Sequence, residues 1–274
     1  MYHLTLFYII VLPILGLALS SVGTLVGLGG GFVLVPVLLV LFPEAAPTTI
    51  SSISLTVVFL NATSATLGNI RARRIDMRTA ALLAIGAIPA AALGAVAATH
   101  VSRDRFEVFF GVMLIVGALY ILWRSRKAIV LQAVGHSPNR QIQERKGPTH
   151  RFYVNTLVAG VISPIGGFLS SFFGIGGGVI HVPAMTFILK MPPRVVSATA
   201  LFVLVPTSLT GVLTRVMSGE FHEGWRRAGL LGLGALIGAQ VGIYLSAKVN
   251  QRVVMLILAA AMTMVGLRQI LSGM

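Results

Sequence analysis

The sequence predicts an all-α polytopic membrane protein built from two homologous halves. Its 274 residues are 56% hydrophobic and 10% charged, with a mean hydropathy of +0.91, whereas a soluble domain has about 25% charged residues. Several uncharged apolar runs reach about 17–25 residues, the length that crosses a bilayer core as a helix. These runs lack the alternation of apolar and polar residues that a transmembrane β-barrel requires.

A ten-residue phrase that occurs twice is the evidence for two halves. Residues 27–36 read GLGGGFVLVP and residues 174–183 read GIGGGVIHVP, an offset of 147 residues. Further matches follow at offsets of 146 to 148, namely Pro47 with Pro193, Ser51 with Ser197, Asn61 with Thr207, Gly86 with Gly234 and Gly94 with Gly242. A repeated glycine interruption inside apolar segments is typical of secondary transporters.

The repeat divides the chain into residues 1–124, a basic linker at 125–150, and residues 151–274. The apolar segments span 4–26, 32–42, 48–69, 79–99 and 106–123 in the first half, and 152–173, 179–189, 195–214, 228–246 and 252–272 in the second. The segments that follow the glycines would be helices of about 16 Å, about half of the bilayer core. Each half is therefore predicted to be a glycine-broken helical hairpin followed by three transmembrane helices.

The basic residues predict which side of the membrane each loop occupies. Fifteen of the 21 Lys and Arg lie on the inner side in an inverted and in a parallel arrangement of the halves alike, so the positive-inside rule leaves both open. Both arrangements place the linker and the loop at 71–78 inside. Residues 4–42 as one helix would span about 58 Å, about twice the bilayer core, and this favours inversion. These loops also explain the net charge of +14, so nucleic acid is not expected as a partner.

The two glycine clusters are the candidate substrate-binding site. They comprise Gly29, Gly30, Gly31, Gly176, Gly177 and Gly178. Each cluster leaves backbone groups unpaired, which is tolerated at membrane depth only beside buried backbone or a cavity. The amides that open the next helix carry partial positive charge and bind anions. Two such helix ends facing each other would form an anion site without a buried cation, whereas close helix packing is the alternative role of the glycines.

Polar side chains on the third apolar segment of each half form the second part of the predicted site. Asn61 and Ser64 of the first half match Thr207 and Thr210 of the second in position and polarity. Such groups replace the hydration of an oxyanion, or they hold helices together. His181, just past the second glycine cluster, is expected either to bind an anion or couple a proton, or to be a neutral imidazole bonded to a neighbouring helix.

Several functions are excluded by what the sequence lacks. The seven carboxylates all lie at span ends, in loops or in the linker, which argues against cation coupling through an intramembrane acid. We find no Ser-His-Asp set, no HExxH motif, no cluster of metal ligands and no cysteine, so we expect no enzyme activity, no metal and no cofactor. No ATP-binding motif is found, so transport would draw on an ion or substrate gradient.

Together these features resemble the TauE/SafE-like membrane proteins, also called the TSUP family. The resemblance rests on the paired motifs at 27–36 and 174–183, the proline-containing loop and Ser/Thr-rich span after each, and the basic linker, and it covers residues 5–272. It implies a multi-pass bacterial inner-membrane exporter of small sulfur-containing or organic anions, such as sulfite or sulfonates. An uptake permease for another small solute and a non-transporting membrane partner subunit are the alternatives. The expected partners are the anion, the lipid bilayer and, in a homo-oligomer, further copies of the chain.

Overall fold

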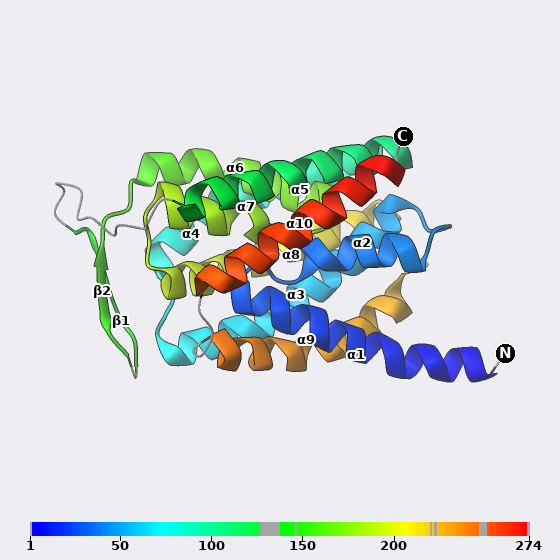
Figure 1. Ribbon diagram of the computed structural model, residues 1–274, viewed down its shortest axis with the longest axis horizontal. Helices are drawn as coiled ribbons and strands as arrows, with labels where there is room; N and C mark the ends of the chain where they lie inside the picture. The colour runs from blue at the N-terminus through cyan, green and yellow to red at the C-terminus, as the bar shows by residue number, and fades with distance from the viewer. Residues whose placement is uncertain are drawn as a thin grey trace.

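A computed structural model of the protein describes residues 2–126, 138–145, 147–219, 221, 224–246 and 251–272, and over these ranges it is mainly helical (Figure 1). The first half contains α1 (Tyr2–Val26), α2 (Gly31–Leu41), α3 (Pro47–Ala72), α4 (Met77–Ala98) and α5 (Arg103–Arg126). The second half contains α6 (Thr156–Phe173), α7 (Gly178–Pro183), the π-helical turn η1 (Ala184–Ile188), α8 (Pro193–Met217), α9 (Trp225–Ser246) and α10 (Gln251–Ser272). The all-α architecture predicted from the sequence is confirmed.

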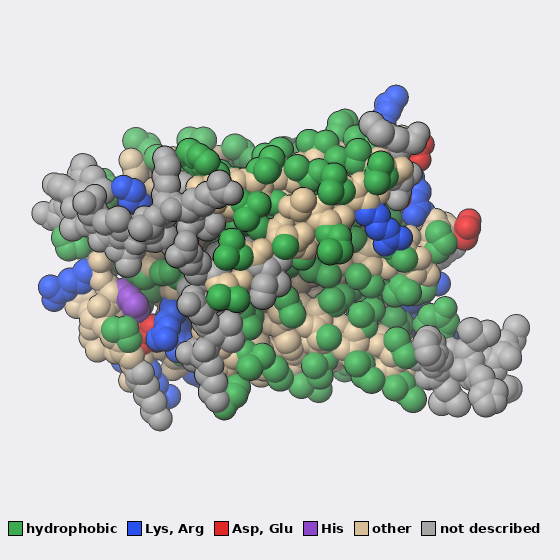
Figure 2. Space-filling view, in the orientation of Figure 1, with side chains coloured by type: hydrophobic (Ala, Val, Ile, Leu, Met, Phe, Trp, Pro, Cys, Tyr) green, Lys and Arg blue, Asp and Glu red, His purple; other side chains and the backbone are tan. Residues whose placement is uncertain are grey.

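The long helices carry an apolar surface that fits a lipid bilayer. Over the described ranges, seven helices are long and apolar enough to cross a membrane, namely α1, α3, α4, α5, α6, α8 and α9. Large side chains on their outer faces include Ile85, Leu93, Val116, Leu119 and Ile237, each at least 60% exposed. Figure 2 shows apolar side chains over the middle of the molecule and Lys and Arg toward its two ends. The protein is therefore a multi-pass membrane protein.

A short β-hairpin marks one end of the helical body. Strands β1 (Arg140–Gln143) and β2 (Thr149–Phe152) pair antiparallel, and the side chain of Asn139 closes the pair by bonding both the amide and the carbonyl of Val154 at 2.9 Å. The sequence predicts a linker here but no strands, because such short polar segments carry little periodic signal. We call this the hairpin end; α1 begins and α10 ends toward the opposite, far end (Figure 1).

The two halves interlock, because most helices pack on the other half. α1 packs along α9, and its repeat counterpart α6 packs along α4. α3 contacts α9 in the same way that α8 contacts α4, while α3 with α8 and α5 with α10 pair equivalent helices across the centre. Neither half could bury its apolar interfaces alone.

Glycines allow the closest of these helix contacts. In α9, Gly234, Gly238 and Gly242 face the carbonyl oxygens of Pro13, Leu17 and Ser21 of α1 in turn. Because both series ascend together, α1 and α9 run in the same direction. α4 and α6 also run together, since Gly86 faces Ser163 and Gly94 faces Phe168. Interfaces of small residues are typical of packed membrane helices, where van der Waals contact replaces the hydrophobic effect.

Each glycine cluster separates a long helix from a short one, as the sequence predicts. The breaks lie between α1 and α2 and between α6 and α7. Gly29, Gly30 and Gly176 have φ angles of 77°, 84° and 75°, a left-handed conformation that side chains with a Cβ rarely adopt. The glycines therefore turn the chain sharply enough for the short helix to return toward the end from which the long helix came.

We predict that Gly234→Ala destabilises the protein. A Cβ on Gly234 would overlap the carbonyl oxygen of Pro13 and lie 2.7 Å from the amide nitrogen of Leu17, and overpacking of this kind costs about 1–3 kcal/mol. Gly229→Ala in the same helix is the matched control, because no atom lies within 4 Å of its Cβ position. The midpoint temperature of thermal unfolding, measured on the purified protein in detergent, should fall for Gly234→Ala only, by about 2–4 °C for each kcal/mol of lost stability. Equal effects of the two changes would contradict this packing.

Candidate functional site

The two glycine clusters lie against each other. A Cβ on Gly178 would lie 2.6 Å from the Cα atom of Leu28, and one on Gly31 would overlap the carbonyl oxygen of Ile175. Leu28 and Ile175 are repeat counterparts, 147 residues apart, so each break presses on the start of the other half's short helix. Each contact is possible because one of its two residues is a glycine, whose missing Cβ leaves room for the opposing backbone.

Val58 of α3 and Leu204 of α8 enclose the crossing. Their methyl groups lie 2.8–3.3 Å from the Cβ positions of both Gly29 and Gly176, and both side chains are fully buried. The two residues are repeat counterparts near the midpoints of helices of 26 and 25 residues. The crossing therefore lies midway along the membrane-spanning helices, where the sequence predicts the site.

The opening amides of both short helices lie at this crossing. Within the described part of the chain, no backbone acceptor pairs with the amides of Gly31, Phe32, Gly178 or Val179, and all four residues are buried. Such amides give a helix start its partial positive charge. The two helix starts thus place positive potential at the centre without a charged side chain.

Asn61 holds the first break in place. Its Nδ2 atom donates to the carbonyl oxygen of Gly29 at 2.8 Å, and its Oδ1 atom accepts from the Thr24 hydroxyl at 2.6 Å. Asn61 is fully buried. One amide side chain therefore links α3 to the end of α1 and to the loop behind it, and it satisfies a carbonyl that the glycine break leaves without a helical partner.

The other three predicted side chains lie away from the crossing contacts. Thr207, the counterpart of Asn61, bonds the carbonyl of Val203 in its own helix at 2.9 Å, and Thr210 bonds the carbonyl of Pro206 at 2.9 Å. Ser64 donates to the Leu236 carbonyl of α9 at 2.8 Å. Threonine hydroxyls reach a carbonyl one turn back, whereas an asparagine amide extends farther. The structure thus brings only Asn61 of this group to a glycine cluster.

His181 lies in α7, just past the second break. Its imidazole is fully buried and faces the Cβ positions of Gly166 and Gly177, at 2.5 and 2.7 Å. Neither ring nitrogen makes a hydrogen bond of normal geometry within the described part of the chain. The hydroxyls of Ser170 and Thr186, also in the second half, are buried and unpaired in the same sense. Unpaired buried groups of this kind are uncommon and often functional.

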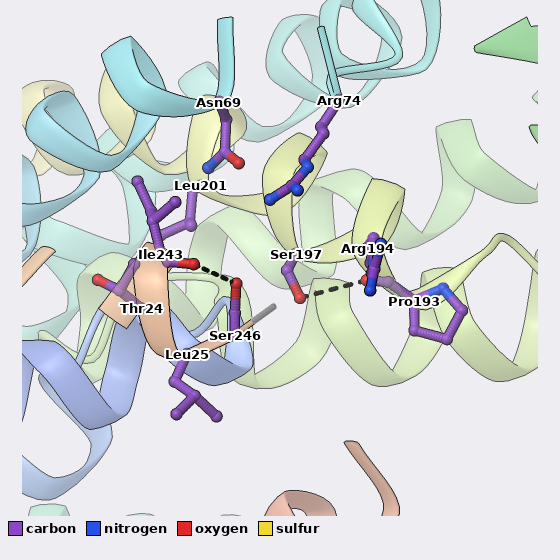
Figure 3. A pocket seen from close by; sticks show the side chains of 10 residues that line it. All are labelled: Thr24, Leu25, Asn69, Arg74, Pro193, Arg194, Ser197, Leu201, Ile243 and Ser246. Atoms are coloured by element: carbon purple, nitrogen blue, oxygen red, sulfur yellow. Dashed lines mark hydrogen bonds between the residues drawn. The ribbon is translucent and has the colours of Figure 1, made fainter. Parts of the chain in front are cut away.

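A polar cavity of about 30 Å³ opens at the hairpin end between α1, α3, α8 and α9 (Figure 3), large enough to hold water. It is lined by Thr24, Leu25, Asn69, Arg74, Pro193, Arg194, Ser197, Leu201, Ile243 and Ser246. Thr24 is the residue that bonds Asn61, so the cavity reaches within one side chain of the first break. Ser197 lies against Gly27, at 2.7 Å between its Cα atom and the Cβ position.

Two arginines give the cavity a positive rim. Arg74 follows α3 and Arg194 opens α8, so each half supplies one, and no carboxylate is among the described residues that line the cavity. Outside the lining, Glu144 of the linker accepts from Arg74 Nε at 2.9 Å and lies 4.0 Å from Arg194 Nη1 and 2.9 Å from His150 Nε2. Burial raises the pKa of Glu144, but the hydrogen bonds from His150 and Arg74 and both arginine charges outweigh it and hold the pKa below its ordinary value.

None of the cavity residues is among the site residues predicted from the sequence. Arg74 and Arg194 entered the prediction only in the count of basic residues that sets topology, and Ser197 was one of several matched hydroxyl positions but was not chosen for the site. A signal was present, because Arg194 replaces Thr48 and Asn69 stands opposite Arg215 at the repeat offset of 146. Where matched repeat positions carry different polar side chains, the two halves are expected to serve different roles.

A lipid-facing helical body, two interrupted helices at its centre and a basic cavity leading toward them define a membrane transporter. The chain belongs to the family described as Sulfite exporter TauE/SafE, whose model matches residues 12–269. The resemblance inferred from the motifs is therefore confirmed. This is a family of membrane transporters, so the expectation that the protein is not an enzyme also holds.

Named relatives agree with this assignment. The chain is 30% identical over 270 residues to the probable membrane transporter protein YunE of Bacillus subtilis, covering 96% of this chain and 98% of that protein. It is 23% identical over 280 residues to a probable membrane transporter protein of Methanocaldococcus jannaschii, covering 96% of this chain and 97% of that protein. No solved structure matches the chain significantly.

We predict that Asn61→Ala loosens the first break. The change leaves the Gly29 carbonyl and the Thr24 hydroxyl without their buried partner, at a cost of about 1–3 kcal/mol. Thr214→Ala is the control, because among the described residues that hydroxyl bonds just the Thr210 carbonyl one turn back in its own helix. The midpoint temperature of thermal unfolding in detergent should drop for Asn61→Ala and change little for Thr214→Ala. A drop of the same size in both would argue against a bracing role for Asn61.

We predict that Glu144 makes stability depend on pH in the acidic range. Because its pKa is lowered in the folded protein, its contribution is full above the unfolded value of about 4.5 and is lost as pH falls through the folded value. Glu144→Gln removes this contribution at neutral pH and flattens the acidic decline, while Glu44→Gln, at an exposed loop, serves as control. The thermal midpoint measured from pH 7 to pH 3 checks this; parallel curves for wild type and Glu144→Gln would refute it.

Proposed function

We propose that the protein is a secondary transporter of the bacterial inner membrane that exports small sulfur-containing or organic anions, such as sulfite or sulfonates, by alternating access. The observation that carries the proposal is the contact of two interrupted helices midway through the molecule, next to a cavity whose described lining has two arginines and no carboxylate. Transporters bind substrate at such interruptions. The hairpin end then faces the cytoplasm, because the linker and the loop at 71–78 bring most of the basic residues there.

The charges along the route select anions. Arg74 and Arg194 attract an anion to the cavity and offer charge-assisted hydrogen bonds to its oxygens. Asn69, Ser197 and Ser246 add neutral polar groups along the wall. Beyond Thr24 and Asn61 lie the opening amides of the short helices, which favour negative charge through backbone dipoles. Glu144 compensates part of the arginine charge from outside the lining, and the charge that it leaves over attracts the anion.

The helix directions support an inverted repeat, and with it alternating access. α3 runs with α9, because Gly68 faces Ile243 and Ser64 bonds Leu236, and α4 returns in the opposite direction after a short turn. Since α1 runs with α9 and α6 runs with α4, the first helices of the two halves run in opposite directions. Halves related in this way can expose one central site to either side by rocking.

His181 is the residue that we propose for proton coupling. It is a protonatable side chain buried beside the second break, and its ring nitrogens have no hydrogen-bond partner of normal geometry within the described residues. An imidazole in this position would take up a proton together with an anion, since each compensates the charge of the other. Self-association into a homo-oligomer stays a prediction.

Flux measurements test the function. Purified protein in liposomes should carry labelled sulfite, sulfoacetate or acetate down an imposed gradient with saturation, whereas labelled sodium should not move. Arg74→Gln and Arg194→Gln should each raise the KM for the anion by about tenfold, the value of one charge-assisted hydrogen bond. Arg78→Gln, exposed at the same end, should leave the KM unchanged. Flux of a neutral solute or cation in place of anions would overturn the proposal.

Two further variants separate transport from the rival roles. Gly30→Leu and Gly177→Leu add a side chain to each break, against Leu19 of α1 and against His181, and should abolish flux while membrane insertion stays normal. A non-transporting partner subunit would tolerate both. Gradients imposed in each direction distinguish export from uptake.

Flux that responds to a pH gradient in wild type but not in His181→Ala would support proton coupling through His181. An unchanged response in His181→Ala would show that His181 does not couple a proton to transport.

A further inference from the structure

Arg215 is a buried arginine near the far end of α8. Its side chain is 1% exposed, and its guanidinium donates to the carbonyl oxygens of Ser171 at 2.8 Å, Phe172 at 3.4 Å and Thr48 at 3.4 Å. Ser171 and Phe172 belong to the last turn of α6, whose carbonyls carry partial negative charge and favour a cation. Arg215 therefore ties the end of α6 to the beginning of α3.

Every residue in this contact is the repeat counterpart of a residue that lines the cavity at the hairpin end. Ser171 corresponds to Thr24 and Phe172 to Leu25 at an offset of 147, while Thr48 corresponds to Arg194 and Arg215 to Asn69 at an offset of 146. Ser51, which bonds the Phe173 carbonyl at 3.3 Å, likewise corresponds to Ser197. The far end thus contains the same set of positions, closed where the hairpin end is open.

The side chains at these positions explain the difference. Asn69 turns back onto the Ala65 carbonyl of its own helix at 3.0 Å and leaves the space beside it open. At the far end, Arg215 instead spans the equivalent space and reaches α6 and α3. Leu25 lines the cavity, whereas Phe172 packs against Phe173, with ring centroids 4.8 Å apart, and against Phe106, at 6.1 Å. The far end is filled because Arg215 is longer than Asn69 and Phe172 is larger than Leu25.

We propose that the far end holds a second vestibule for the same small anions, locked in this structure by Arg215, and that the structure is the state open to the hairpin end. This rests on the two-sided access proposed above. When the far end opens, the guanidinium leaves the three carbonyls and faces the vestibule, where the oxygens of a small anion replace them as acceptors. Arg215 is then the far-end equivalent of the arginines at the cavity rim.

Single cysteines test the lock, because the chain has no cysteine of its own. Ser197→Cys should react with a membrane-impermeant thiol reagent added at the hairpin end, and Ser51→Cys should resist the reagent added at the far end. In Arg215→Asn, which restores the residue of the other half, labelling of Ser51→Cys from the far end should rise at least tenfold and that of Ser197→Cys should fall. Arg105→Asn, exposed at the same end, should change neither rate.

Further variants keep the test decisive if Arg215→Asn folds poorly. Ala235→Cys, fully buried in α9, should stay unlabelled in every background, and its labelling identifies a misfolded variant. Phe172→Leu opens the far end without removing Arg215, and it should raise Ser51→Cys labelling from that end. If neither Arg215→Asn nor Phe172→Leu changes the labelling of Ser51→Cys in folded protein, the lock is wrong.

The labelling needs no substrate, so it is independent of the transport assay. Far-end access that appears in Arg215→Asn while no anion is carried would preserve the lock and overturn the proposed function. Anion flux by a wild-type protein in which Arg215→Asn gives no far-end access would preserve the function and overturn the lock.

Discussion

The fold depends on where unpaired backbone groups can be placed in a membrane. Each glycine break removes helical partners from several amides and carbonyls, and lipid cannot replace them. The protein places each break against the other, with Leu28 beside Gly178 and Ile175 beside Gly31, and Asn61 supplies a partner for the Gly29 carbonyl. The interlocked packing of the two halves agrees with this, because helices of both halves enclose each break: Val58 of α3 and Leu204 of α8 contact Gly29 and Gly176 alike.

The repeat supplies a symmetric frame, and its departures from symmetry supply the differences between the two ends. Asn61 braces the first break, while Thr207 bonds its own helix. His181 has no polar counterpart, since the first half carries Leu34 at that position. Asn69 leaves a cavity open at one end, and Arg215 closes the matching space at the other. Positions that match between the repeats maintain the common fold, and a few polar substitutions between the repeats make its two ends different.

The sequence predicted the features that depend on local chemistry. The helix bounds and both breaks follow from apolar runs and clustered glycines, and the observed α3 extends the predicted segment 48–69 by only a few residues. The cavity, the pairing of Glu144 with Arg74 and the burial of Arg215 depend on contacts between segments more than 40 residues apart. Periodicity along the sequence carries no information on such contacts. Ser64, Thr207 and Thr210 show the limit for the site: matched polarity in a repeat does not fix where a short side chain finds its acceptor.

The contacts that hold the two halves together differ in strength between the hairpin end and the far end. At the hairpin end, Glu144 bridges Arg74 and Arg194, one from each half, but the arginine side chains are 17% and 45% exposed, and water and salt weaken such pairs. At the far end, Arg215 binds backbone carbonyls in a fully buried setting, where hydrogen bonds are stronger. Under the alternating access proposed above, one end closes when the other opens. The weaker contacts lie at the open end, and this is the arrangement expected if the buried arginine sets which side the resting protein faces.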